Sequence, residues 1–95
     1  MNTAITMSFM QRLYESAYGN GIISATVRSK DDVLDIDTAF RFDHWELSED
    51  KEHILIYGED DIKIDVCPRN MVEARRENGL YIFNTKSLEM TVSFI

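Results

Sequence analysis

The chain has 95 residues, of which 44% are hydrophobic and 28% are charged, and its net charge is −7. This length fits one domain, residues 1–95, and the composition excludes a disordered chain. No apolar run reaches the ~18 residues of a membrane span and the N-terminus lacks the basic start of a signal peptide, so we expect a cytoplasmic protein with no membrane partner. Cys67 is the single cysteine, which excludes an intrachain disulfide.

The negative charge is concentrated in the middle of the chain. Residues 31–65 hold 13 acidic and 3 basic side chains, a net charge of −10 (3 − 13), whereas the segments on either side are slightly positive. A surface of this sign repels a phosphate backbone, so we expect that nucleic acid is not the partner. A basic protein is the more natural partner, and solubility is the alternative explanation for the charge.

Residues 3–18 predict a helix. Ile5, Phe9 and Leu13 recur at spacings of four residues and form an apolar stripe. A helix this short is marginal alone, so we expect its stripe to pack on the rest of the domain.

Residues 22–28 and 33–44 predict two strands of a hairpin. A turn centred on Lys30 and Asp31 would place Val27 opposite Leu34. The inward face then continues through the phenylalanines of the second strand, and its aspartates point to the opposite face. A slip of one residue would bury those aspartates, so the face assignment is strongly specified.

Residues 53–66 predict a second hairpin around an acidic turn. Centring it on Glu59 and Asp60 places Leu55 opposite Ile64, with Ile54 and Ile56 on the other face. Between the two hairpins, alternation breaks near Trp45, which indicates a bulge or a strand end. A polar turn follows, and it would bring His44 opposite His53.

Residues 69–78 predict a short helix or helical turn after Pro68, and a last hairpin follows with Phe83 opposite Leu88. We therefore expect an α+β fold, with an N-terminal helix followed by a curled, mostly antiparallel sheet or small barrel of about six strands.

Two surfaces are predicted to bind partners. The first is an acidic face, and its residues are Asp35, Asp37, Asp43 and Asp65. The second is an apolar patch that includes Ile54 and Ile56 on the outer face, although the helix or the curvature of the strands could instead cover it. We also expect a homo-oligomer, formed through this patch or through an unprotected edge on the strand ending at Ile95.

No catalytic constellation is recognisable, so we expect a protein that is not an enzyme and that uses no cofactor. Asp35 and Asp37 resemble a metal pair, but alternation along a strand explains them, and His44, His53 and Cys67 match no zinc spacing. We therefore expect no metal site.

The predicted function is a non-enzymatic protein–protein interaction module. The alternatives are an acidic antagonist or nucleic-acid mimic that binds a basic protein, and an RNA-binding small barrel that uses the arginines of residues 69–76.

Overall fold

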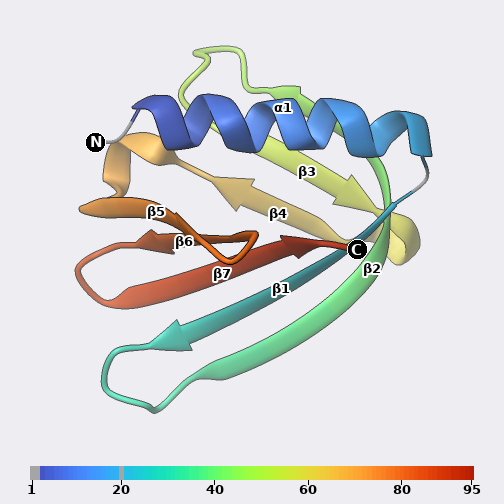
Figure 1. Cartoon of the computed structure of the whole chain (residues 1–95). Coiled ribbons are helices and arrows are strands. Elements are labelled where there is room, and N and C mark those ends of the chain that lie inside the picture. The colour runs from blue at the N-terminus through green and yellow to red at the C-terminus, as the bar shows by residue number, and fades with distance from the viewer. Residues whose placement is uncertain (1–2, 20) are drawn as a thin grey trace.

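A computed structural model describes residues 3–19 and 21–95, and it consists of one helix packed on a curled sheet (Figure 1). The elements are, in chain order, α1 (Thr3–Gly19), β1 (Ile22–Ser29), β2 (Asp35–Leu47), β3 (Ile54–Gly58), the 3-10 helix η1 (Glu59–Asp61), β4 (Lys63–Val66), the 3-10 helix η2 (Pro68–Asn70), β5 (Glu73–Glu77), β6 (Leu80–Asn84) and β7 (Leu88–Phe94). No helix in the described part of the chain is long and apolar enough to cross a membrane.

The seven strands form one antiparallel sheet in the order β4-β3-β2-β1-β7-β6-β5. The sheet curls but does not close, and β4 and β5 are its two edges (Figure 1). The predicted α+β fold with a curled sheet is therefore confirmed, with seven strands in place of about six.

The core lies between α1 and the inner face of the sheet. Phe9 and Leu13 of the helix are fully buried, which confirms the role of the apolar stripe. The Phe9 ring lies edge-on to Tyr81 and Phe83, with ring centroids 5.3 Å and 5.1 Å away. The Tyr81 hydroxyl is hydrogen-bonded to Ser8 Oγ at 2.8 Å, so the one polar atom of this aromatic cluster is satisfied.

Of the short helix or helical turn predicted for residues 69–78, only a helical turn is present, as η2. The rest of the segment forms β5, which pairs with β6. Ala74 points inward and is buried opposite Phe83, while Arg75 points outward between Glu73 and Glu77. These residues favour helices intrinsically, but hydrogen bonding to an open strand outweighs that weak preference.

The two loops that flank β2 are built alike. In the first, Ser29 Oγ donates to the Asp31 carboxylate at 2.6 Å and accepts the N–H of Leu34 at 2.8 Å. In the second, Ser48 and Asp50 make the equivalent contacts. Each loop therefore closes on its serine, and the carboxylate satisfies a backbone N–H within the turn.

The loop that closes on Ser29 sets the register between β1 and β2. Ser29 lies opposite Leu34, so Val27 lies opposite Ile36 rather than opposite Leu34 as predicted. The last hairpin is shifted in the same way, with Phe83 opposite Met90. Both shifts are of two residues, so the predicted faces survive the error in pairing.

The β3–β4 register differs from the prediction by one residue. Ile64 lies opposite Ile56, not Leu55, because η1 closes the turn with Gly58 opposite Ile62. A shift of one residue turns β3 over. Ile54 and Ile56 are consequently 2% and 0% exposed and belong to the core, so the predicted outer patch is wrong at both positions.

β2 contains a bulge between Phe42 and His44, which confirms the irregularity predicted near Trp45. The bulge places His44 opposite Tyr57, so the predicted pairing of His44 with His53 is wrong. The strand ending near Ile95 is not an edge, because β7 lies between β1 and β6. The features predicted for self-association are thus two buried side chains of β3 and a central strand.

Candidate functional site

The predicted acidic residues are all exposed, and they are Asp35, Asp37 and Asp43 on β2 and Asp65 on β4. Asp35 forms a 3.4 Å ion pair with Arg28, and Asp37 accepts a 2.7 Å hydrogen bond from Thr26 Oγ1. Asp35 and Asp43 are eight residues apart on one strand, which corresponds to about 26 Å at ~3.3 Å per residue. This distance is about three Debye lengths at physiological salt, so the structure does not bring the four carboxylates together.

Each histidine has a carboxylate partner of its own. His44 Nδ1 lies 3.0 Å from Asp43 Oδ2, and the His44 ring stacks on Tyr57 with centroids 4.5 Å apart. His53 Nδ1 lies 2.7 Å from Asp65 Oδ1, and this hydrogen bond raises the pKa of His53. Within residues 3–19 and 21–95, no group of three or more His, Cys, Asp or Glu side chains could hold a metal ion.

The arginines of residues 69–76 are engaged within the chain. Arg69 bonds Glu52 at 2.6 Å, and Arg75 bonds both Glu73 and Glu77 at 3.1 Å and 3.2 Å. These carboxylates raise the pKa of Arg69 and Arg75. Arg76 stacks over the Tyr81 ring at 5.3 Å. A nucleic acid would have to compete with these contacts for each of the three arginines.

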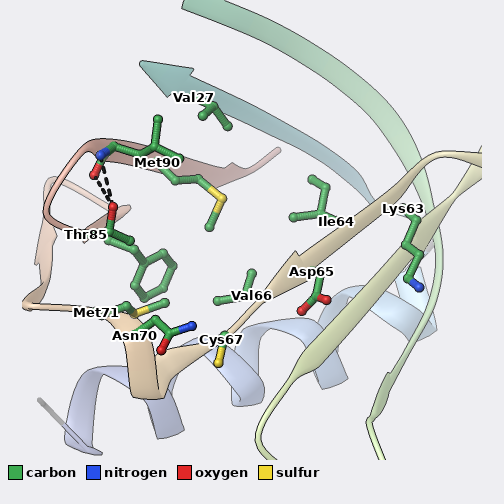
Figure 2. A pocket seen from close by; sticks show the side chains of 12 residues that line it. Val27, Lys63, Ile64, Asp65, Val66, Cys67, Asn70, Met71, Thr85 and Met90 are labelled. Atoms are coloured by element: carbon green, nitrogen blue, oxygen red, sulfur yellow. Dashed lines mark hydrogen bonds between the residues drawn. The ribbon is translucent and has the colours of Figure 1, made fainter. Parts of the chain in front are cut away.

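A cavity of about 430 Å³ opens on the inner face of the sheet, between β4 on one side and β1 and β7 on the other (Figure 2). Apolar side chains form most of its wall, among them Val27, Ile64, Phe83 and Met90. Residues 63–67 also line it in unbroken succession. Neighbouring side chains on a strand point to opposite faces, so this continuity indicates that the edge of β4 itself borders the cavity.

The first half of β2 has a neighbour on one side only. β1 pairs with β2 from Asp35 to Arg41, whereas β3 joins β2 only from Phe42 onward. The Phe42 N–H donates to Gly21 in the direction of β1, while the Arg41 N–H points the other way, to the Glu59 carboxylate at 3.1 Å.

Backbone groups along a strand alternate in direction, so those of Asp35, Asp37 and Ala39 also point away from β1. No described strand pairs with them on that side. We call these three outward N–H and C=O pairs the β2 free edge.

Exposed apolar side chains lie beside the β2 free edge. Ile36 is 48% exposed and lies opposite Val27, which lines the cavity. Val33 and Leu34, in the loop before β2, are 83% and 42% exposed. Ile36 and the hairpin tip therefore leave exposed apolar surface near the cavity wall at Val27, and exposed apolar surface of this kind marks contact surfaces.

Comparison with protein-family models, with curated proteins and with solved structures finds no match to this chain. Its function is therefore inferred from its own geometry. Asp35 and Asp37 are predicted contact residues, whereas the free edge that they share with Ala39 is not among the predicted surfaces. A signal was available in the unequal strand lengths, because the alternation on β2 extends well beyond what the short run at β3 can pair.

Proposed function

We propose that this protein is a non-enzymatic protein–protein interaction module that binds its partner through the β2 free edge and the apolar side chains beside it. The observation that carries the proposal is that β2, from Asp35 to Arg41, has a neighbouring strand on one side only. The other long strands of the sheet have neighbours on both sides. Open strand edges are templates for main-chain hydrogen bonds, and the side chains next to them give specificity.

The partner would bury groups that folding leaves in water. Ile36, Leu34 and Val33 keep large parts of their surfaces exposed. Burying such side chains fully is worth roughly 1.5–3 kcal/mol each. The three outward backbone pairs supply donors and acceptors at the same place, so apolar contact and main-chain pairing would reinforce each other.

The other functions have less support. An acidic antagonist or mimic needs carboxylates that act as one surface, and Asp35 and Asp43 lie too far apart for that. An RNA-binding barrel needs available arginines, and Arg69 and Arg75 are already ion-paired. A cytoplasmic location remains part of the proposal, because a reducing compartment suits the free thiol of Cys67.

The test uses Ala39, whose N–H belongs to the free edge. Ala39→Pro removes this outward donor and adds bulk to the edge, but it leaves the hydrogen bonds to β1 intact. Ala39→Val keeps the donor and is the matched control. Both variants, checked for equal thermal stability, would be used to capture proteins from a lysate of the native host. We expect capture by Ala39→Val and loss of the same proteins with Ala39→Pro.

Capture that is equal for the two variants would show that the β2 free edge is not the contact surface. Light scattering of both variants separates binding of a second copy from binding of another protein. A molar mass that falls from dimer to monomer on Ala39→Pro would identify the partner as a second copy of this chain.

A further inference from the structure

Resting on the proposed function, we infer that the β2 free edge takes an extended segment that alternates basic and apolar residues and adds to the sheet beside β2. The inference comes from the two faces of the β2 free edge, which differ in chemistry. On the outer face the edge presents the carboxylates of Asp35 and Asp37, and on the inner face it presents Ile36.

Strand geometry predicts which residues the bound segment would carry on each of its two faces. A strand added beside β2 would place its side chains about 4.5–5.5 Å from those of β2 on the same face. Its outer residues would lie beside Asp35 and Asp37, where opposite charges stabilise the pair and like charges destabilise it. Its inner residues would lie beside Ile36 and would extend the apolar wall of the cavity.

The charges near the free edge favour the same partner. Glu59 accepts the N–H of Arg41 at 3.1 Å and so brings a carboxylate to the point where the edge ends. On the β1 side Arg28 pairs with Asp35 at 3.4 Å, whereas the Asp37 carboxylate accepts a hydrogen bond from Thr26 and forms no ion pair with any described residue. An incoming lysine or arginine would supply a cation there.

The same charges disfavour a second copy of this chain as the occupant. If two β2 free edges paired antiparallel along their whole length, Asp37 would lie directly opposite Asp37 of the other copy, and each Asp35 would lie diagonally from that residue. Like charges directly opposite each other on a sheet are destabilising. Charge therefore selects a partner strand that is different from β2 and positive.

The direct test is a binding titration with a labelled synthetic peptide that alternates lysine with valine, followed by fluorescence anisotropy. The controls are the same peptide with glutamate in place of lysine, and the lysine peptide with alternate backbone nitrogens methylated. We expect the lysine peptide to bind and both controls to bind at least tenfold more weakly. Methylation removes the peptide's own edge donors, so it tests strand addition without any change in the protein.

A protein variant tests the charge pairing. The double variant Asp35→Asn, Asp37→Asn removes two opposite-charge pairs, each worth ~0.2–1 kcal/mol, so affinity should fall roughly two- to thirtyfold. Binding by this variant should also depend less on salt. The matched control is Glu49→Gln, which removes an exposed charge in the turn after β2, at the opposite end of that strand, and should leave the affinity unchanged.

Hydrogen exchange locates the added strand. The amides of Asp35, Asp37 and Ala39 should exchange fast in the free protein and slowly with the lysine peptide bound, while the amides of Ile36 and Thr38 are slow in both states. Equal binding of the glutamate peptide, or protection that arises at Lys63 and Asp65 instead, would overturn the inference. If the lysine peptide does not bind but lysate capture still depends on Ala39→Pro, the basic partner is wrong and the proposed function stands.

Discussion

Gly58, at the end of β3, lies under the ring of Phe40, and this contact is open to a decisive test. A Cβ atom at Gly58 would lie 2.8 Å from Phe40 Cε2 and closer still to Cδ2. Phe40 is 2% exposed, so its ring has no solvent to move into. The backbone of Gly58 is extended, with φ −125° and ψ −176°, so the requirement for glycine comes from the ring and not from the conformation.

The magnitude follows from the size of the overlap. Carbon atoms in contact are ordinarily about 3.5–4.0 Å apart, so the Gly58→Ala substitution forces the Phe40 ring to move by about 1 Å or more within a packed core. Overpacking of this kind costs typically ~1–3 kcal/mol. In a domain of this size each kcal/mol lowers Tm by roughly 4–8 °C.

The assay is urea denaturation of four proteins: the parent, Gly58→Ala, Phe40→Val and the double variant. Gly58→Ala should cost about 1–3 kcal/mol in the parent and close to nothing when Phe40 is valine. Gly21→Ala is the control, because its new Cβ would meet Ser16 Cβ at an ordinary 3.6 Å. An equal cost of Gly58→Ala with phenylalanine or valine at position 40 would refute the reasoning.

Two further outcomes are expected. Phe42→Ala should lower the free energy of unfolding by ~3–5 kcal/mol, since Phe42 is 2% exposed and its loss leaves a cavity; a loss below ~1 kcal/mol in urea melts would contradict its place in the core. The hydrogen bond to Asp65 raises the pKa of His53 in the folded protein. The protonated histidine therefore stabilises the fold fully at pH values below the unfolded histidine pKa of about 6.5. This stabilisation disappears as the pH rises through the higher pKa of His53 in the folded protein. The stability difference between the parent and His53→Gln should therefore be largest in acid and decline with rising pH. A difference independent of pH, or one unchanged by Asp65→Asn, would contradict this pairing.

The sequence determined the features that depend on local periodicity. The helical spacing of Phe9 and Leu13 predicted a stripe that is buried in the structure, and alternation along β1, β2 and β7 predicted the correct faces. Such patterns survive an error of two residues in pairing. The repeated Ser-x-Asp motif, at Ser29 and again at Ser48, would also have placed both flanking loops correctly, because side-chain bonds within the loop fix where each hairpin closes.

The tertiary structure alone decided the features that depend on distant neighbours. The face that β3 presents to the core depends on the odd length of η1, where Asp60 and Asp61 adopt positive φ without being glycine. Residues 73–77 became a strand because β6 offered an unpaired edge, against their own helical preference. The β2 free edge exists because β3 stops at Gly58 while β2 continues. The unequal lengths of the two alternating runs indicate that β2 extends past β3, but only the tertiary structure shows that no other described strand takes the empty place.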